Sequence, residues 1–339
     1  MQAGGQGFDS PRLHDRNIFQ KNRSLFYRSP FFHYADWVTR KATLLFLSVG
    51  GIWGIPYFLI AIAVDYFETA SVVFLRVFIG ALILIPIAVS RKMIRPALKA
   101  WPAVLAFAVL EMVLPWYLIT EAERSISSSL AGLLITSVPF IAAFLVGLLG
   151  DRSAWHPLTI LGLVLGFSGV VALVGIDVFA GKLSLVPVVM MLGAATGYAV
   201  APIIANRISS EVPILGVISL SLVFVSIIYA PFAAISLPRD IAGGIPLSAW
   251  GAVGILGAVC SALAFVIFFS LIREVGPARA SLITYVNLAV AIVLGVIFLE
   301  EPITVGLFVG LPLVVTGSYL ASRSRETYRY RGTTRNQAT

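Results

Sequence analysis

Charged residues are scarce in this sequence. Only 12% of its 339 residues are Asp, Glu, Lys or Arg, whereas 59% are hydrophobic and the mean hydropathy is +0.95. A soluble domain is typically about a quarter charged. The scarcity therefore excludes an ordinary soluble enzyme and predicts an integral membrane protein.

Cysteine and histidine are also rare. The one cysteine, Cys260, cannot form a disulfide within the chain. The three histidines, His14, His33 and His156, lie outside the long apolar runs, which argues against a metal site inside the membrane. The sequence has no phosphate-binding loop of the GxxxxGKS or GxxxxGKT type, which argues against an ATP-driven pump in this chain. We expect neither a metal nor a cofactor.

Ten apolar runs are present. Each is near the roughly 20 residues that a helix needs to cross a hydrocarbon core about 30 Å thick. The connections between the runs are short, so there is no room for a separate soluble domain. We therefore predict an all-α integral membrane protein with ten transmembrane helices. The runs are 43–63, 69–90, 101–120, 127–149, 157–176, 183–204, 212–235, 248–271, 278–299 and 302–321.

Basic residues lie mostly on one side of the predicted spans. With the N-terminus inside, 20 of the 24 Lys and Arg residues fall on inner segments, and only Arg124, Lys182 and Arg239 fall on outer loops. Basic residues near span ends mark the cytoplasmic side, so both termini are predicted to be cytoplasmic. The net charge of +8 then reflects a basic cytoplasmic face beside anionic lipid, and no nucleic-acid partner is expected.

Two basic tails flank the spans, residues 1–41 and 323–339. Residues 4–14, GGQGFDSPRLH, resemble the translation of a transfer-RNA T-arm. We therefore expect the natural start of translation to lie downstream of Met1. In the alternative interpretation, these residues form a disordered cytoplasmic tail. The aromatic residues between 26 and 37 fit the membrane interface as a further alternative.

The spans repeat within the chain. Residues 134–169 match residues 282–317 without a gap, at an offset of 148. Each unit holds five spans, 42–177 and 183–322, and because five is odd the second unit crosses the membrane in the opposite direction. Inverted repeats are typical of secondary transporters, with the substrate site near the midplane between them. The matching residues are Thr136, Ala143, Gly147, Gly162 and Gly169, with Thr284, Ala291, Gly295, Gly310 and Gly317.

Three segments resemble one family. They are LEMVLPWYLITEAERSISSSLAGLLITSVP (110–139), CSALAFVIFFSLIREVGPARASLITYVN (260–287) and FLEEPITVGLFVG (298–310). With them the chain is similar, over roughly 42–322, to EamA-domain transporters of the drug/metabolite transporter superfamily. The resemblance implies ten spans in two inverted repeats, cytoplasmic termini and transport of small solutes, often efflux of metabolites or amino acids. Many members have Asn-Pro where this chain has Asn287-Leu288, which weakens the expectation of a helix break there.

Two ionisable residues lie deep within the predicted spans, Arg76 and Glu111. At 1.5 Å of rise per residue their depths differ by only about 5 Å, and charges within a membrane usually have a partner or face water. In the structural interpretation they form an ion pair, directly or through water, that fixes two spans. In the functional interpretation at least one of them meets a solute, or Glu111 exchanges a proton during transport.

Other candidates give weaker signals. Trp53 and Tyr198 lie among glycines in the spans that open the two units, and small residues beside a large ring leave space for a pocket. Glu300 and Glu301 follow the ninth span, and we expect them to be solvated charges at a helix end. The remaining pathway candidates are Trp116, Thr284, Tyr285 and Asn287, and helix packing is the preferred interpretation for Gly162, Gly166, Gly306 and Gly310.

We predict a secondary transporter that moves a small metabolite, amino acid or drug-like solute across the plasma membrane by alternating access, with efflux favoured. A passive channel is an alternative. An integral-membrane enzyme that modifies lipid is a weaker one. It would need a nucleophile, base or metal cluster near a membrane face, and the sequence has no histidine within the spans and no Asp/His pairing. The expected partners are the solute and the bilayer, with a coupling proton left open. The substrate and the oligomeric state are left open too.

Overall fold

A computed structural model describes residues 39–150, 155–179, 184–205, 208, 212–275, 280 and 282–336. Within those residues every regular element is a helix, as the long apolar runs predict. The predicted start site and the N-terminal tail up to residue 38 lie outside them. The structure divides after Leu44, and the helix contacts given below belong to the part from Leu45 onward.

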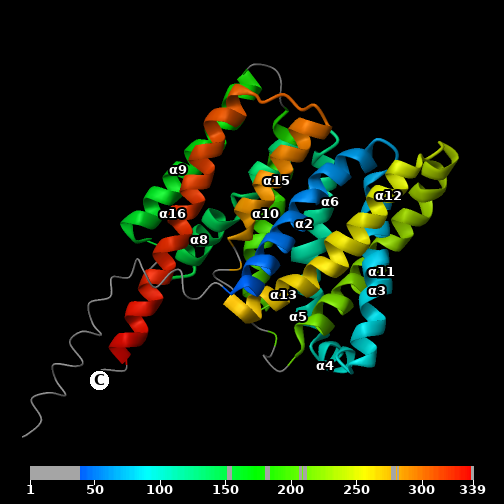
Figure 1. Ribbon diagram of the computed structural model, residues 1–339, viewed down its shortest axis with the longest axis horizontal. Helices are drawn as coiled ribbons and strands as arrows, with labels where there is room; N and C mark the ends of the chain where they lie inside the picture. The colour runs from blue at the N-terminus through cyan, green and yellow to red at the C-terminus, as the bar shows by residue number, and fades with distance from the viewer. Residues whose placement is uncertain are drawn as a thin grey trace, which may run out of the picture. The chain divides into compact units, whose positions relative to one another are not determined.

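Helices follow one another along the chain (Figure 1). Two spans contain a stretch of the wider π form, so that α5, η1 and α6 make one span and α12, η3 and α13 make another. The elements are α2 (Arg40–Val64), α3 (Thr69–Ser90), α4 (Ile94–Lys99), α5 (Trp101–Ala108), η1 (Val109–Val113), α6 (Leu114–Ala122), α7 (Ser128–Ile135), α8 (Val138–Leu148), α9 (Pro157–Phe179), α10 (Leu185–Ala205), α11 (Ile214–Ala242), α12 (Leu247–Ile255), η3 (Leu256–Leu263), α13 (Ala264–Val275), α15 (Ile283–Phe298) and α16 (Val305–Asn336).

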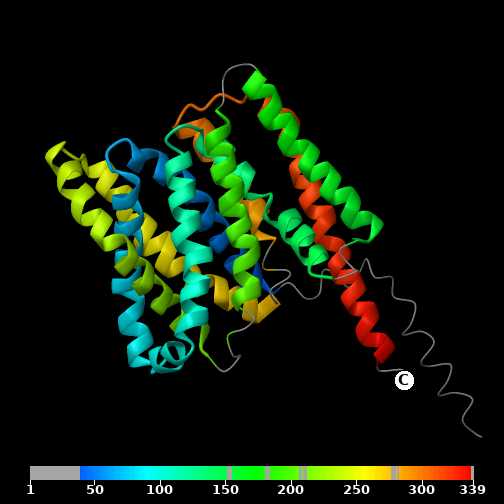
Figure 2. The ribbon, with the colours of Figure 1, turned by 180° about the vertical axis from the view of Figure 1, so that it is seen from behind.

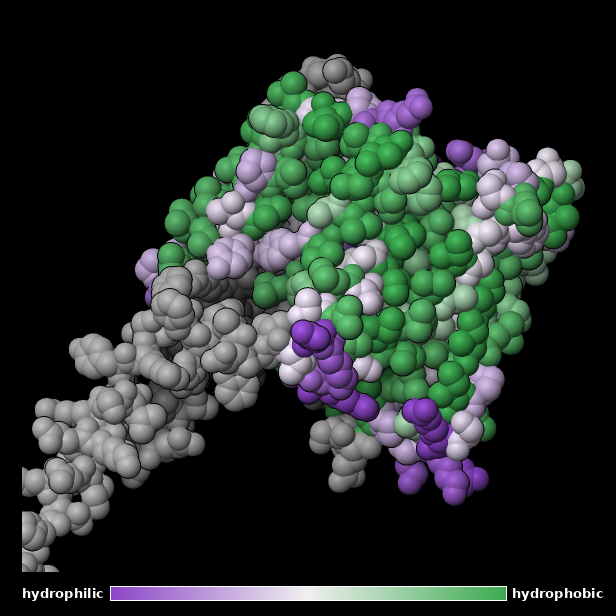
Figure 3. All heavy atoms as spheres, in the orientation of Figure 1, coloured by the Kyte–Doolittle hydropathy of each residue, from purple (hydrophilic) through white to green (hydrophobic). Residues whose placement is uncertain are grey.

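Seven stretches of the described residues are long and apolar enough to cross a membrane. Three further apolar helices, Pro157–Ala172, Ile283–Phe298 and Val305–Leu320, are shorter. These ten lie at the ten predicted runs, but the count of ten crossings stays a prediction. Large apolar side chains are exposed, such as Leu247 at 86% and Phe308 at 75%, and apolar side chains cover most of the face in Figure 3, with hydrophilic ones gathered toward the helix ends. Lipid is the environment that such a surface fits.

Small residues bring α9 and α16 together, and the two helices lie side by side in Figures 1 and 2. A Cβ atom added at Gly317 would lie 2.6 Å from the Cα atom of Gly166 and 2.7 Å from the carbonyl oxygen of Gly162. No real Cβ atom fits at such distances, so this approach needs glycine at residue 317. Gly306 and Gly310, the other two predicted packing glycines, are buried on α16.

The two π-helical segments occupy corresponding positions in the two predicted units. Adding the repeat offset of 148 to Val109–Val113 gives 257–261, which lies within Leu256–Leu263. π-helical turns are rare and often lie at functional sites. η1 packs beside α10 and α11, and η3 packs beside α3. The sequence repeat therefore has a counterpart in local helix geometry.

The fourth predicted span is interrupted at Thr136, between α7 and α8. The Thr136 hydroxyl donates to the carbonyl oxygen of Leu133 (2.6 Å). Pro139 lies in the first turn of α8, where the missing N–H of proline costs no helix hydrogen bond. In contrast, α15 runs unbroken through Asn287.

Candidate functional site

Arg76, the buried charge of α3, lies over the indole ring of Trp116. The distance from its guanidinium carbon to the ring centroid is 3.8 Å, and its Nε donates to the hydroxyl oxygen of Ser261 (2.9 Å). Arg76 and Trp116 are only 8% and 4% exposed. A cation over an aromatic face in a desolvated site is worth about 2 kcal/mol, which offsets part of the cost of burying the charge.

The π-helical segment η3 supplies two consecutive residues to this arrangement. The Ser261 hydroxyl accepts from Arg76 and donates to the carbonyl oxygen of Leu256 (2.9 Å). The carbonyl oxygen of Cys260 accepts from the indole N–H of Trp53 (3.1 Å). This one widened turn therefore holds a side chain from α2 and a side chain from α3.

Glu111 and Tyr198 complete the cluster from two further elements. Glu111 lies in η1, and Tyr198 of α10 interacts electrostatically with both Glu111 and Arg76. The α10 backbone approaches η1 closely because residue 197 is glycine: a Cβ atom on Gly197 would lie 2.7 Å from the carbonyl oxygen of Leu110. The structure thus brings five predicted candidates to one place, and we call them the central cluster: Arg76, Glu111, Trp53, Trp116 and Tyr198.

No ion pair joins Arg76 and Glu111 in the part of the chain that the structure describes. Ser261 and Trp116 take up the guanidinium instead, which corrects the interpretation in which the two charges pair directly. Within the same residues, no hydrogen bond reaches the terminal nitrogens of Arg76 or the carboxylate of Glu111.

The remaining candidates, Thr284, Tyr285 and Asn287, lie on α15. The side-chain NH2 group of Asn287, in the orientation that its surroundings require, donates to the carbonyl oxygens of Gly50 (2.6 Å) and Ile283 (3.0 Å). This ties α15 to α2. Thr284 and Tyr285 are half-buried on the same helix. A role of these three residues in contact with a solute stays a prediction.

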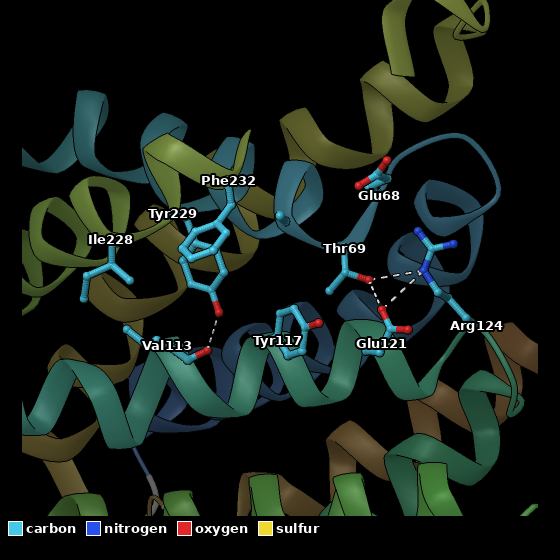
Figure 4. A pocket seen from close by; sticks show the side chains of 10 residues that line it. Glu68, Thr69, Val113, Tyr117, Glu121, Arg124, Ile228, Tyr229 and Phe232 are labelled. Atoms are coloured by element: carbon cyan, nitrogen blue, oxygen red, sulfur yellow. Dashed lines mark hydrogen bonds and ion pairs between the residues drawn. The ribbon is translucent and has the colours of Figure 1, made fainter. Parts of the chain in front are cut away.

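A pocket of about 640 Å³ opens beside the third span, between α3, α6 and α11 (Figure 4). Its wall is aromatic: the rings of Tyr117 and Tyr229 stack with 6.5 Å between their centroids, and Phe232 packs on Tyr229. The Tyr229 hydroxyl donates to the carbonyl oxygen of Val113, the last residue of η1 (2.9 Å). The pocket therefore reaches the same π-helical segment that carries Glu111.

The other end of the pocket is polar. Arg124 pairs with Glu121 (3.5 Å) and donates to the hydroxyl oxygen of Thr69 (3.2 Å) and the carbonyl oxygen of Phe67 (2.6 Å). The Thr69 hydroxyl in turn donates to Glu121. Figure 4 shows Thr69, Glu121 and Arg124 joined as one group. Arg124 and Glu121 neutralise each other, so the charges at this end of the pocket have partners within the protein.

Glu301 is not the solvated charge that we expected. Its carboxylate accepts from the N–H groups of Ser128 (2.6 Å) and Ser129 (3.0 Å) and from the Ser129 hydroxyl (2.5 Å). These N–H groups begin α7, where backbone donors lack helix partners and a negative charge is stabilised. Gly295 faces the same three residues, so that the carboxylate has room. Glu301 therefore fastens α7 to the segment before α16.

Glu123 is a buried carboxyl group that the sequence reasoning missed. It follows α6 directly, is 5% exposed, and neither side-chain oxygen has a hydrogen-bond partner among the described residues. It interacts electrostatically with Glu301, Arg76 and Tyr57. Burial first, and then the charge of Glu301, raise the pKa of Glu123 well above its usual range, while Arg76 acts in the opposite direction.

Among the described residues, no group of three or more His, Cys, Asp or Glu side chains is arranged to hold a metal ion. The chemistry that remains is that of charge, hydrogen bonding and aromatic contact. Contact of Arg76, Glu111 or the rings of the central cluster with a solute stays a prediction.

Comparison with known proteins points to one family. The model of the EamA-like transporter family matches residues 40–175 and again residues 185–323. The Bacillus subtilis (strain 168) protein named "Uncharacterized transporter YvbV" is 28% identical over 293 residues, which cover 84% of this chain and 92% of that protein. "Uncharacterized inner membrane transporter YedA" of Escherichia coli (strain K12) is 26% identical over 252 residues, covering 72% and 78%.

A likeness to solved structures is also found. One crystal structure of a protein superposes with a TM-score of 0.57 at 18% identity, covering 83% of this chain and 96% of that chain. At that identity the likeness shows a shared fold alone.

Proposed function

Because the chain belongs to the EamA-like transporter family of the drug/metabolite transporter superfamily, we propose that it is a secondary transporter that moves a small solute by alternating access. A multi-pass membrane transporter is what the family match and the relatives indicate. The mechanism, the solute and the direction are the parts of the proposal that follow.

Ten crossings in two inverted five-helix repeats form the framework of the proposal. The ungapped sequence match at an offset of 148 supports it, as do the two matches of the family model and the two π-helical segments at corresponding positions. In such a framework the solute site lies near the middle of the membrane, between the repeats. The central cluster contains residues of both repeats: Tyr198 lies in the second (183–322), and the other four residues lie in the first (42–177).

Arg76 carries the proposal for the site. Its Nε and its face are occupied by Ser261 and Trp116, so its terminal nitrogens remain to bind an anionic group in a fixed direction. Glu111 offers a carboxylate to a cationic group, and Tyr198 lies within electrostatic reach of both. A solute that carries both charges, as an amino acid does, fits this arrangement, and the rings of Trp53, Trp116 and Tyr198 suit an apolar part.

The proposed orientation has both termini in the cytoplasm and the protein in the inner membrane. The distribution of basic residues supports the orientation, and the name of the Escherichia coli relative supports that membrane by analogy. The end of the helices that carries Glu121, Glu123 and Glu301 then faces outward. Export is the proposed direction, on the resemblance to the family alone.

The alternatives fit less well. A passive channel needs an open path with a ring of charge or carbonyl groups, whereas Arg76 and Trp116 are closely packed. An enzyme acting on lipid needs a nucleophile and a base in contact near a membrane face. Among the described residues, the buried carboxyl groups have no such hydroxyl or histidine partner outside the cap of α7.

Metabolite profiling followed by counterflow tests the proposed function. Cells with and without the gene are first compared to find the solute that accumulates on deletion. Purified protein in liposomes loaded with that solute should then exchange it for external labelled solute, which neither a channel nor an enzyme does. Arg76→Lys should abolish exchange, because lysine lacks the planar group that binds Trp116 and Ser261 together. Arg239→Lys, on an exposed arginine, should leave the exchange unchanged. The proposal would be overturned if folded wild-type protein showed no counterflow.

A further inference from the structure

Glu123 is linked electrostatically to the central cluster and to the cap of α7. The groups that interact with it come from three different elements: Tyr57 from α2, Arg76 from α3, and Glu301 from the segment before α16. Arg76 belongs to the central cluster, and Glu301 holds the first residues of α7. A change of charge on Glu123 would therefore be felt both at the proposed solute site and at a helix end.

The surroundings of Glu123 suit a neutral carboxyl group better than an anion. Both oxygens are fully buried, and no donor reaches either one among the described residues. An ionised carboxylate that is buried without donors is strongly destabilised. Glu301, by contrast, accepts three hydrogen bonds, as an ionised carboxylate does, and its charge opposes a second one beside it.

Among the described residues, Arg76 is the one cation that interacts with Glu123, and it is held by other groups. Its Nε is bound by Ser261 and its face lies on Trp116, so it does not hydrogen-bond Glu123. When Glu123 is neutral, the charge of Arg76 is available to a solute. When Glu123 is ionised, it competes for that charge.

We propose that Glu123 is a proton-binding site, and that its protonation strengthens the binding of an anionic solute group at Arg76. A proton from water adds to one carboxylate oxygen of Glu123 and returns to water on release. By linkage, a solute anion on Arg76 favours the protonated form of Glu123 to the same extent that protonation favours the solute. This linkage rests on the proposed function, whereas the protonation of Glu123 does not.

Infrared difference spectroscopy on the full chain in lipid tests the protonation without any solute. Glu111 is a second carboxyl group inside the helix bundle, so the variants are compared in a Glu111→Gln background. There, raising the pH should remove the C=O stretching band of a protonated carboxyl group, and adding Glu123→Gln should abolish that change. Adding Glu121→Gln, two residues earlier and paired with Arg124, or Glu301→Gln should keep it. A band that survives the addition of Glu123→Gln would overturn the proposal, and so would the absence of the band from Glu111→Gln itself. If Glu123→Gln does not fold, Glu123→Asp must shift the band, and an unshifted band would overturn the proposal.

Counterflow at several pH values then tests the linkage. With the solute found by profiling, the apparent affinity of the wild type should fall by roughly fivefold or more as Glu123 ionises, the range of a typical coupling between sites. Glu123→Gln should bind tightly at every pH. If Glu123 titrates but the apparent affinity for the solute does not change with pH, the linkage is overturned, whereas the proposed transporter function is not. If Glu123 titrates but the protein shows no counterflow, the proposed function is overturned, whereas the proton-binding site is not.

Discussion

The Oε1 atom of Glu301 accepts the N–H of Ser128 at 2.6 Å, across 173 positions of the sequence. With the two bonds from Ser129, this makes Glu301 a second cap of α7, beside the N-cap Ser127, whose hydroxyl accepts from the N–H of Leu130. Glu301→Gln removes the charge from a helix N-terminus and weakens hydrogen bonds to a charged group, so we expect a loss of about 1–3 kcal/mol in stability. Thermal unfolding in detergent measures it. Glu300→Gln, on the exposed neighbour, is the matched control, and equal melting temperatures for the two variants would contradict the cap.

The stacking of Arg76 on Trp116 gives a second prediction. Trp116→Ala removes the ring beneath a buried guanidinium, and we expect transport to fall at least tenfold, because a desolvated cation–π contact of about 2 kcal/mol is lost. Trp116→Phe keeps an aromatic face and should retain part of the activity. Trp250→Phe is the control, since Trp250 packs on Phe67 rather than on a cation. Initial rates of counterflow are the measurement, and a result in which Phe behaves like Ala would argue against the aromatic face.

Ser261 gives a third prediction. Ser261→Ala leaves the Nε of Arg76 without its acceptor, and a buried donor without a partner costs about 1–3 kcal/mol. We expect both a lower melting temperature and weaker solute binding. Ser270→Ala removes an exposed hydroxyl that bonds only within its own helix, to Val266, and should have neither effect. A normal solute affinity in Ser261→Ala would show that Arg76 needs no orientation.

The contact of α9 with α16 gives a fourth prediction. Gly317→Ala places a methyl group against the backbone of Gly166, and overpacking of this kind costs about 1–3 kcal/mol. Gly251→Ala in α12 meets no atom within 4 Å, so it should be neutral or stabilising by up to about 1 kcal/mol. Thermal unfolding of both variants in one detergent is the comparison. A Gly317→Ala protein as stable as the wild type would show that the two helices can move apart freely.

The elements were predictable because their signal is local. An apolar run of about 20 residues predicts a membrane helix without any tertiary information, and a charge within such a run is visible at once, which is how Arg76 and Glu111 were found. Their partners were not predictable in the same way. Residue counting gives depth along a helix but not the direction around it, and the π turn of η1 changes that direction.

Two carboxyl groups show the opposite limit: Glu123, which the sequence analysis did not single out, and Glu301, which it expected to be solvated. Glu123 lies near Glu121 and Arg124 at the end of a span, where charges are normally solvated, yet it is buried. The groups that interact with it electrostatically lie on α2, on α3 and in the segment before α16. Glu301 has the same local character, and its cap is formed with a helix 172 residues away. No pattern within either segment reports such contacts, because they arise only when distant helices pack.

Glu123 gives the last prediction, the dependence of stability on pH. Its pKa in the folded protein is raised, by burial first and by Glu301 second. The pKa of a glutamate in the unfolded chain is about 4.3. Between these two values the folded protein binds one more proton than the unfolded chain. Its free energy of unfolding therefore falls as the pH rises above about 4.3, by up to about 1.4 kcal/mol per pH unit, until the folded-state pKa is passed.

Glu123→Gln has no proton to lose, so this part of the slope should vanish, and the variant should gain on the wild type as the pH rises. Glu121→Gln should keep the wild-type slope, because Glu121 is partly exposed and paired with Arg124. Melting temperatures of the three proteins over one pH series make the measurement. Parallel curves for wild type and Glu123→Gln would mean that Glu123 is ionised in the folded protein. Arg76 would then have to stabilise that charge without a hydrogen bond, and would be less available to a solute.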